Sequence, residues 1–548
     1  MNPEDIRIRW PDHAPDLLLP AAPLSAGNLA ERVAQAGRPL NTRCGQHGLC
    51  AGCTVKLVRG TFRQLDGTDV TAPCEVKACQ GYVPPGTQAV VAVPARSLAV
   101  HRPQVVTTFK VNVPAAHQPL VHVEPGRRDH GLAIDIGTTT VVVALVELTT
   151  GNIVREETAF NQQIELGDNV LTRIQLAGAP GQLEVLRRAI VSRTLVPLIG
   201  AACAAAGVAS ERLAGAVVAG NTTMLHLLTG TDPTSMGVAP FRPVFTQHRV
   251  LTASALQLTG APPAMPVHLL PGFSAYVGAD LVAGCVCTGL LNDPGPSLLV
   301  DIGTNGEILL RHGGRLMATA TAAGPAFEGG RLACGTRAVA GAIAHVSFPE
   351  DCFPPRLDVI PNGAHVAGLC GSAYIDFLAH GRQIALLGPS GRIAAAAWAA
   401  LPPAHRHSAG PQSGDGRGVR LRADDPATLV TEADIAQLLQ AKAAVATGML
   451  MLLRRAGIAA AEVRRLYLAG GFGLHLDVAN AIACGLLPGF RPEQVDVVGN
   501  TALGGAWLAL VDRTILPEMT AVGAAAEIVE LNRESSFEDT FIDQLALP

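Results

Sequence analysis

The sequence predicts a multidomain protein in which a small, mostly β module precedes a larger α/β part built from two related lobes. Short β-like stretches at 6–10, 54–58 and 89–93 surround a group of cysteines near the start of the chain. From residue 131 the composition changes to apolar strands that alternate with Ala-, Gly- and Leu-rich helical segments. These patterns favour an α+β fold for the first region and an α/β fold for the second.

An internal repeat predicts the two lobes. Residues 133–143 and 299–309 each read as apolar strand, tight polar turn and apolar strand, and both turns begin with Asp-Ile-Gly-Thr. A hairpin used twice at long separation predicts two related lobes facing one another across a cleft. We expect helices at 182–206 and 432–456, and an exposed loop or hairpin insertion at 411–426, which is rich in Gly, Ser, Asp and Arg.

The chain is expected to divide into four segments. With 548 residues it is too long for one hydrophobic core. We place the cysteine module at 1–97, a linker rich in Val, Pro and His at 98–128, a middle domain with the first lobe at 129–285, and the C-terminal lobe at 286–548. Hydrophobic residues make up 48% and charged residues 16%, which is typical of a folded rather than a disordered chain.

Charge and hydropathy limit the classes of partner. The formal net charge is −4 and there is no long run of Lys or Arg, which argues against binding to nucleic acid or to an anionic membrane. Residues 1–5 lack the basic and apolar segments of a secretory signal, and no uninterrupted apolar run reaches about eighteen residues. We therefore expect a cytoplasmic protein that binds its partners through shaped sites.

The cysteines of the first module have the spacing of an iron–sulfur site. Cys44, Cys50 and Cys53 are separated by five and two residues, and the intervening glycines let the backbone wrap closely around a cluster. A 2Fe-2S cluster needs a fourth thiolate, for which Cys79 and Cys74 are the candidates. We prefer Cys79, because Ala-Cys-Gln leads into a β-like stretch whereas Pro-Cys-Glu around Cys74 looks like a loop.

Other metal sites fit the pattern less well. Zinc also takes four thiolates, but its cysteines usually come as two close pairs. His47 lies within the loop, but a Rieske centre needs two histidine ligands, and the second is missing from the pattern. The plant-type ferredoxin spacing has four residues between the first two cysteines, and this chain has one more.

The two Asp-Ile-Gly-Thr turns are typical of a phosphate clamp. Glycine permits close approach of a phosphate to the backbone, and the neighbouring hydroxyls and amides are hydrogen-bond donors. The donors are expected in two sets, Gly137, Thr138, Thr139 and Thr140 in the first turn and Gly303, Thr304, Asn305 and Gly306 in the second. Asp135 and Asp301 would repel a bare phosphate and should act through Mg²⁺ or water. No Gly-x-x-x-x-Gly-Lys-Ser/Thr sequence is present, which excludes a P-loop.

A glycine pair completes the nucleotide pattern. Gly470 and Gly471 follow a predicted strand and suit an adenosine that lies flat on the backbone. Together the three turns resemble those of the acetate and sugar kinase, Hsp70 and actin superfamily, and the resemblance implies ATP and a divalent ion between two ribonuclease-H-like lobes. Glu307 is our candidate for orienting the hydrolytic water, with Asp135 and Asp301 in the metal shell. The alternative for Glu307 is a plain polar residue of a strand.

Most of the chain resembles the reductive activators of corrinoid proteins. The resembling segments include Gly-Asn-Thr-Thr-Met-Leu-His at 220–226, Ala-Pro-Phe-Arg-Pro-Val-Phe at 239–245, Thr-Ala-Ala-Gly-Pro-Ala-Phe-Glu-Gly at 321–329 and Gly-Asn-Thr at 499–501. The resemblance implies a β-grasp ferredoxin-like domain, a linker and the two-lobed ATPase. It also implies that an external donor reduces the 2Fe-2S cluster, that one electron passes to Co(II) of a corrinoid protein to regenerate Co(I), and that a homodimer is the working unit.

Other functions remain as alternatives. The nearest is an ATP-driven activator of another low-potential enzyme, although such activators carry the cluster cysteines within the ATPase lobes. A plain ferredoxin would not need the ATPase part, a small-molecule kinase would not need the cysteines, and an ATP-dependent chaperone would hold no iron. Two features are expected to be structural: His226 as a core histidine, and Cys285 with Cys287 as buried residues rather than a redox pair.

Overall fold

The fold is described from a computed structural model that divides into two compact units. Unit 1 comprises Met1–Arg102, Gly329–Ala373 and Ala395–Ile435, and unit 2 comprises Pro103–Glu328, Tyr374–Ala394 and Ala436–Pro548. The structure describes residues 5–10, 15–40, 42, 46, 53–93, 97, 107–167, 169–330, 332–349, 353–363, 365–408, 416–471 and 475–548. Each unit is treated separately below.

The N-terminal part of unit 1 is a β-grasp sheet. Its order is β2-β1-β8-β3-β6, and β1 pairs in parallel with β8 while the other pairs are antiparallel. The helix α1 (Leu29–Gln35) starts at an Asn28 capping box and buries Leu29 and Val33 in the same core as the sheet. The strands are β1 (Asp5–Arg9), β2 (Leu17–Pro20), β3 (Thr54–Arg59), β6 (Cys74–Lys77) and β8 (Ala89–Ala92), with a small sheet of β4 (Thr61–Gln64), β5 (Asp69–Thr71) and β7 (Gly81–Tyr82) beside them. The predicted β-like stretches at 6–10, 54–58 and 89–93 are confirmed.

The remainder of unit 1 contains two three-stranded sheets. One has the order β19-β18-β20 and the other the order β21-β22-β23. Their strands are β18 (Ala342–Ser347), β19 (Arg356–Val359), β20 (Gly368–Leu369), β21 (Arg406–Ser408), β22 (Arg417–Arg420) and β23 (Leu429–Thr431), and α8 (Ala395–Ala400) lies between β20 and β21 in the sequence. The segment predicted as a loop or hairpin insertion at 411–426 contains β22, and its residues 411–415 lie outside the described residues.

Unit 2 contains two six-stranded sheets that share the topology of five strands and add the sixth at opposite edges. The first has the order β11-β10-β9-β12-β14-β13 and the second β25-β24-β15-β16-β17-β26. In each, three antiparallel strands are followed by a strand that pairs in parallel with the first of them. The first sheet comprises β9 (His130–Ile136), β10 (Thr140–Glu147), β11 (Ile153–Phe160), β12 (Leu213–Gly220), β13 (Arg249–Thr252) and β14 (Pro266–Leu269); the second comprises β15 (Ser297–Ile302), β16 (Gly306–His312), β17 (Arg315–Thr321), β24 (Arg465–Ala469), β25 (Val495–Gly499) and β26 (Glu527–Ile528). Both are ribonuclease-H-like, so the predicted repeat is confirmed.

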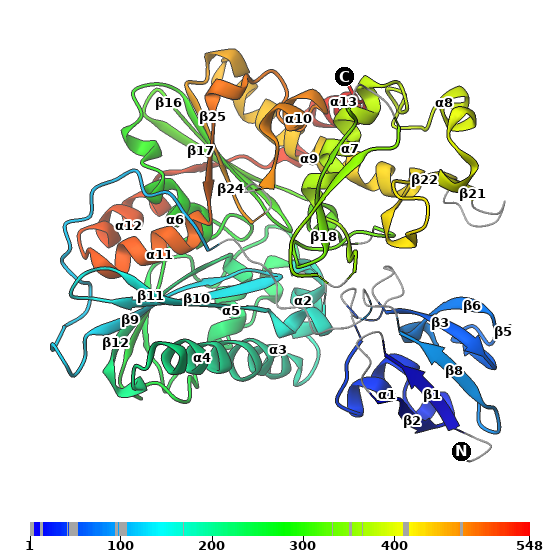
Figure 1. Ribbon diagram of the computed structural model, residues 1–548. Helices are drawn as coiled ribbons and strands as arrows, with labels where there is room; N and C mark the ends of the chain where they lie inside the picture. Colours follow the sequence, from blue (N-terminus) through cyan, green and yellow to red (C-terminus); the bar gives the residue numbers. More distant parts are fainter. Residues whose placement is uncertain are drawn as a thin grey trace. The chain divides into compact units, whose positions relative to one another are not determined.

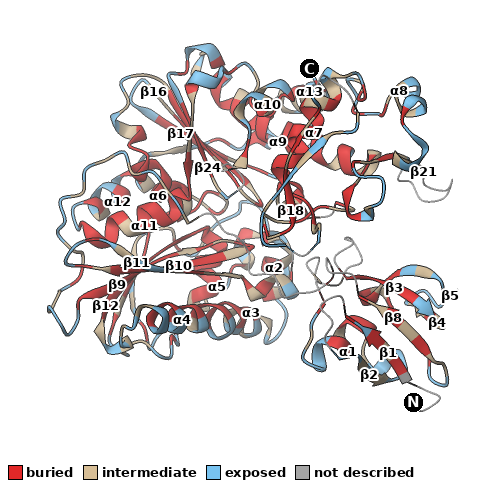
Figure 2. Cartoon of the chain, in the orientation of Figure 1, coloured by how far each residue is buried: buried red, intermediate tan, exposed pale blue. Residues whose placement is uncertain are grey.

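Three helices lie between the two sheets, namely α6 (Ala279–Cys287), α11 (Thr501–Val511) and α12 (Ile515–Ala525) (Figure 1). Figure 2 shows α6 and α11 buried over most of their length. Small residues let these two helices approach closely, because a Cβ added at Gly505 would lie 2.5 Å from the Cβ of Ala283. One hydrophobic core therefore spans both sheets.

The predicted helices cover the outer faces of the sheets. Residues 182–206 form α3 (Gln182–Ile190) and α4 (Val196–Ala206) with a π-helical turn between them that periodicity did not predict, and α9 (Glu432–Ala456) matches its predicted range. By length and composition both 25-residue stretches would suit a membrane span. However, 50% and 78% of their most apolar windows are buried inside the fold, which packing against the sheets explains. The other helices are α2 (Val170–Ala177), α5 (Thr222–Thr229), α7 (Gly371–Gln383), α10 (Val478–Ala483) and α13 (Phe537–Gln544).

The described part of the predicted linker runs along unit 2. Phe109 forms an isolated antiparallel bridge with Gly499, and the amide of Asn112 donates to the carbonyl of Cys287 at the end of α6. Further along, the amide of Leu120 donates to the carbonyl of Leu510 in α11. Residues 107–128 are thus hydrogen bonded to the helices between the sheets, whereas 98–106 lie outside the described residues.

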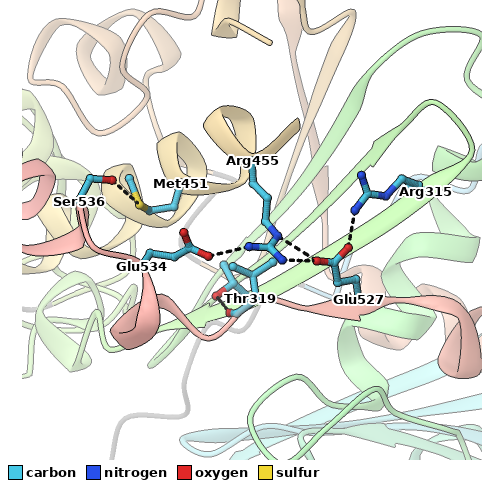
Figure 3. Close-up of polar contacts among 8 residues, drawn as sticks. Arg315, Thr319, Met451, Arg455, Glu527, Glu534 and Ser536 are labelled. Carbon is cyan, nitrogen blue, oxygen red and sulfur yellow. Dashed lines mark hydrogen bonds and ion pairs between the residues drawn. The ribbon is translucent and has the colours of Figure 1, made fainter. Parts of the chain in front are cut away.

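A charged network attaches the last part of the chain to the second sheet (Figure 3). Arg455 at the end of α9 donates to Glu527 in β26 and to Glu534, and Arg315 in β17 donates to the other oxygen of Glu527. The buried hydroxyl of Thr319 donates to the carbonyl of Val529 at 2.8 Å. The ion pairs are substantially exposed, so the buried hydrogen bond and the strand pairing are the firmer attachments.

Candidate functional site

The two Asp-Ile-Gly-Thr turns meet in unit 2. Each turn is closed by an amide of its glycine, from Gly137 to the carbonyl of Thr140 and from Gly303 to the carbonyl of Asn305, both at 2.9 Å. The hydroxyl oxygens of Thr139 and Thr304 lie 3.1 Å apart. The fold therefore brings together the two turns that the sequence predicts as hydrogen-bond donors to phosphate.

Four carboxyl groups gather behind these turns. Asp135 and Asp301 are the second-last residues of β9 and β15, and Glu307 pairs directly across from Asp301 in the β15–β16 ladder. Asp280, in the first turn of α6, is near enough to raise the pKa values of the other three. The sequence analysis missed Asp280; its available signal was an acidic residue two positions after Gly278, in the first turn of α6.

Removal from water shifts the protonation of all four groups. Desolvation, with repulsion from the neighbouring carboxylates, raises the pKa of Asp135 to about 7 and that of Asp301 to about 8. Desolvation also raises the pKa of Asp280 to about 6, opposed by backbone amides at the start of α6, and places the pKa of Glu307 well above its ordinary value. Glu307 is buried and the three aspartates are half-buried. Strongly perturbed carboxyl groups in one place are typical of a functional site.

A metal would need ligands from outside the chain. Among the residues that the structure describes, no three His, Cys, Asp or Glu side chains are close enough to hold one ion. Mg²⁺ usually keeps several waters and is bound by one or two carboxylates together with substrate phosphates. The carboxyl groups beside two phosphate turns therefore suit a magnesium–nucleotide complex better than a protein-only metal site.

The glycine pair lies next to the second turn. Gly470 has a positive φ of 96°, and a Cβ there would lie 2.7 Å from a carboxylate oxygen of Asp301 and closer still to the carbonyl oxygen of Ile302. Only glycine fits this position. Gly471 is exposed, and residues 472–474 lie outside the described residues. The structure therefore brings Gly470 and Asp301 together, as the three-turn pattern requires.

Two asparagines that the sequence analysis did not assign hold the first turn. Asn500 caps α11 through its Oδ1 and donates from Nδ2 to Asp135 at 2.8 Å, and Asn221 caps α5 and donates to the hydroxyl of Thr138 at 2.9 Å. Both stand in a Gly-Asn-Thr tripeptide directly after a strand. This repeated tripeptide was the available signal. At the second turn, Thr304 donates to Glu328 at 2.9 Å.

The cysteine module lies in unit 1, and its description covers only part of the predicted site. Cys53 and Cys79 are buried, and the amide of Ala78 donates to the carbonyl of Cys53 at 3.1 Å, whereas Cys44 and Cys50 lie outside the described residues. Ala78–Gln80 forms a 3₁₀ turn that leads directly into β7 at Gly81, as expected for Cys79, whereas the loop expected around Cys74 is wrong, because Cys74 begins strand β6. Cys74 pairs with Leu57 in β3. Leu57 lies three positions, or roughly 10 Å, along the strand from Thr54, the residue that follows Cys53.

The residues expected to be structural are buried. His226 accepts a hydrogen bond from the amide of Val244 and stacks on Phe245, as a core histidine does. Cys285 and Cys287 are buried in α6, and burial raises the pKa of Cys287 to about 12 and that of Cys285 further. Burial likewise raises the pKa of three other buried thiols, those of Cys203, Cys370 and Cys484.

Two ribonuclease-H-like sheets with paired Asp-Ile-Gly-Thr turns define a protein of the ASKHA class, which includes actin, Hsp70 and the sugar kinases. Residues 130–293 match the family described as the RACo middle region, and residues 295–548 match the C-terminal domain of RACo, the ASKHA domain. The chain therefore belongs to the RACo family of reductive activators of corrinoid proteins.

Individual relatives agree with this assignment. The corrinoid activation enzyme RamQ of Eubacterium limosum is 31% identical over 424 residues, which cover 75% of this chain and 69% of that protein. The [Co(II) methylated amine-specific corrinoid protein] reductase of Methanosarcina barkeri is 23% identical over 432 residues, covering 76% of this chain and 77% of that one. A solved reductive activator for a corrinoid, iron-sulfur protein is similar over 99% of this chain and 98% of its own, with 28% identity and a TM-score of 0.72.

Proposed function

We propose that this protein reductively activates a corrinoid protein at the expense of ATP. One electron passes from a 2Fe-2S cluster in the cysteine module to Co(II) of the partner's corrinoid and regenerates Co(I), the state that accepts methyl groups. The observation that carries the proposal is the likeness over nearly the whole chain to a solved reductive activator of a corrinoid protein. The proposal includes an external electron donor, a homodimer as working unit and a cytoplasmic location, with domain limits at 1–97, 98–128, 129–285 and 286–548.

The cysteine module would hold the cluster through Cys44, Cys50, Cys53 and Cys79. The placement of two of these thiols supports the assignment. Cys53 and Cys79 are both buried, and the hydrogen bond from the amide of Ala78 to the carbonyl of Cys53 holds the two segments together. When bound, a 2Fe-2S cluster supplies a one-electron carrier of low potential. The role of the chain's own residues is to hold the thiolates and exclude water.

The site in unit 2 would hold magnesium and ATP. The two turns donate amide and hydroxyl hydrogens to the phosphates, and Gly470 with Gly471 leaves room for adenosine. Asp135 and Asp301 would hold the metal shell directly or through water, and Glu307 would orient the hydrolytic water. A bound cation favours the ionised carboxylates and so lowers their raised pKa values, which means that binding of magnesium and ATP should release protons near neutral pH.

ATP has to offset an unfavourable electron transfer, because Co(I) is a stronger reductant than most ferredoxin clusters. A ligand with about 10⁴-fold preference between two conformations supplies roughly 5.5 kcal/mol. A tenfold change in a one-electron equilibrium corresponds to about 59 mV, so the same preference offsets roughly 240 mV. We propose that binding of the Co(II) protein and ATP changes the coordination of cobalt and that hydrolysis then separates the partners.

An anaerobic assay tests the proposal. The protein, with its cluster reduced, is mixed with a candidate corrinoid protein, and the conversion of Co(II) to Co(I) is followed by visible absorbance with and without ATP. We expect Co(I) only when ATP is present. Equal reduction without ATP would rule out the coupling, and ATP-dependent reduction of a different low-potential enzyme, with none of any corrinoid protein, would favour the alternative function.

A further inference from the structure

The side chain of Gln80 connects the two halves of the cysteine site. Its Nε2 donates to the backbone carbonyl of Gln46 at 2.7 Å, and it lies 3.3 Å from the carbonyl oxygen and 3.4 Å from the sulfur of Cys79. An amide nitrogen carries two hydrogens. One is therefore directed to the loop between Cys44 and Cys50, and the other is shared between the carbonyl and the thiol of Cys79.

The backbone around Gln80 is held by its neighbours. The carbonyl of Gln80 accepts a hydrogen bond from the amide of Leu65 at 3.0 Å. The following residue, Gly81, lies against β4 so closely that a Cβ there would meet the ring of Phe62 at 2.5 Å. With its main chain fixed on this side, the Gln80 side chain is directed towards the cysteine loop.

Gln46 is held from a second direction. Asn28, which caps α1 through its Oδ1, donates from Nδ2 to the Oε1 of Gln46 at 2.8 Å. Gln46 has a positive φ of 68°, a conformation that non-glycine residues adopt only occasionally. It also lies in the loop that has one residue more than the plant-type ferredoxin spacing. Asn28 and Gln80 therefore hold Gln46 in its unusual conformation from two directions.

We propose that Gln80 is a positioning residue that holds Gln46 and, by donating to the sulfur of Cys79, raises the reduction potential of the bound cluster. The inference rests on the 2Fe-2S site proposed above. Reduction adds one electron to a cluster of thiolates and sulfides without making or breaking a bond. A hydrogen bond to a ligand sulfur stabilises the added negative charge, so its removal makes the cluster harder to reduce.

The test is an anaerobic redox titration of the full-length, cluster-loaded protein, followed by visible absorbance and accompanied by iron and sulfide analysis. Gln80→Leu removes the donor, and Gln80→Glu keeps the side-chain length but has no hydrogen to donate. Gln88→Leu is the matched control, because Gln88 is half-buried and far from the cysteines. Its carbonyl lies against Gly60, which follows the last residue of β3, whereas Cys53 precedes the first residue of β3, roughly 20 Å away along the strand.

We expect both Gln80 variants to lower the equilibrium constant for reduction about tenfold, a shift of about 59 mV to lower potential, while Gln88→Leu titrates like the unmodified protein. If Gln80→Leu binds little iron, the potential of Gln80→Glu is compared with that of the unmodified protein instead. Unchanged potentials at full iron content would overturn the role of Gln80 and leave the cluster standing. An unmodified protein that binds no iron after anaerobic reconstitution would overturn the proposed site and this inference with it.

Discussion

The two hairpins of unit 2 share a fold but differ in chemistry, and a single residue of turn length accounts for much of the difference. In the first hairpin Asp135 pairs with Val142, and in the second Asp301 pairs with Glu307. The second turn is one residue shorter than the first. Val141, which aligns with Glu307 in the sequence, therefore pairs with Ile136, one residue beyond Asp135. Because strand side chains alternate between faces, this shift puts Glu307 on the same face as Asp301.

The surroundings of the two aspartates differ as well. Asp135 receives a hydrogen bond from Asn500, which opposes the rise in its pKa, whereas Asp301 lies against Gly470 and is repelled by both Asp280 and Asp135. The pKa of Asp301 is accordingly raised further, to about 8 against about 7. Asp135 thus has a donor that favours its ionised form, whereas carboxylates and burial disfavour ionisation of Asp301, although the same strand order builds both hairpins.

The largest effect is expected from Asp301→Asn. Removing the charge should abolish magnesium-dependent binding of ATP, measured by calorimetry. It should also stabilise the nucleotide-free protein at pH 8. The raised pKa means that Asp301 contributes its stability below about pH 4 and loses it as the pH rises through about 8, so a neutral side chain avoids that loss.

Thermal unfolding measures this second effect of Asp301→Asn. We expect the midpoint to rise by a few degrees at pH 8, since about 1 kcal/mol shifts a large domain by about 2–4 °C. The gain should shrink as the pH falls and nearly disappear at about pH 4, where the carboxyl is protonated in both the folded and the unfolded chain. Asp135→Asn is the matched comparison and should give a smaller gain, because the pKa of Asp135 is raised less. An equal gain from both would remove the asymmetry described above.

The next largest effect is expected from Glu307→Gln and concerns the hydrolysis of ATP alone. Glu307→Gln should lower the turnover of ATP by about 10²–10³-fold with little change in the affinity for ATP, because a residue that orients water acts mainly on the chemical step. Glu157→Gln is the control, a strand glutamate of the first lobe that pairs with Arg155. Turnover is measured by phosphate release and affinity by nucleotide titration. Unaltered turnover in Glu307→Gln would make this residue a plain part of the strand.

A smaller loss is expected from Asn500→Asp. The aspartate keeps the acceptor that caps α11 but replaces the donor to Asp135 by a second carboxylate. The affinity for magnesium and ATP should fall about tenfold or more, as a hydrogen bond to a charged group contributes about 1.5–3 kcal/mol. Asn221→Asp tests the equivalent cap at Thr138, a neutral partner, and should weaken binding less.

The smallest effect tests the contact between the two turns. Thr139→Val and Thr304→Val each remove one hydroxyl of the pair that lies 3.1 Å apart. In a double-mutant cycle on the dissociation constant of ATP, we expect a coupling of about 0.5–1.5 kcal/mol, typical of one hydrogen bond. Strict additivity would mean that the turns bind phosphate independently.

The repeats and the strands were predictable because their signals are local. Strand periodicity at 54–58 and the two Asp-Ile-Gly-Thr turns each carry their own pattern, and the fold has the elements that they predict. Asp280 and Asn500 were not predicted because their importance arises from tertiary contacts: each begins a helix far along the chain from Asp135. The loop expected around Cys74 was wrong, since pairing of β6 with β3 overrides the turn signal of the preceding proline.

Five buried cysteines outside the cysteine module, four in unit 2 and Cys370 in unit 1, have a practical consequence for labelling experiments. Only a thiolate reacts with alkylating agents, and burial holds Cys203, Cys285, Cys287, Cys370 and Cys484 as thiols well above neutral pH. These five cysteines should not react with iodoacetamide in the native protein. Peptide mass spectrometry after brief alkylation can therefore follow occupancy of the Cys44–Cys79 module without signal from these five, and the appearance of label on Cys285 would report loss of the native core.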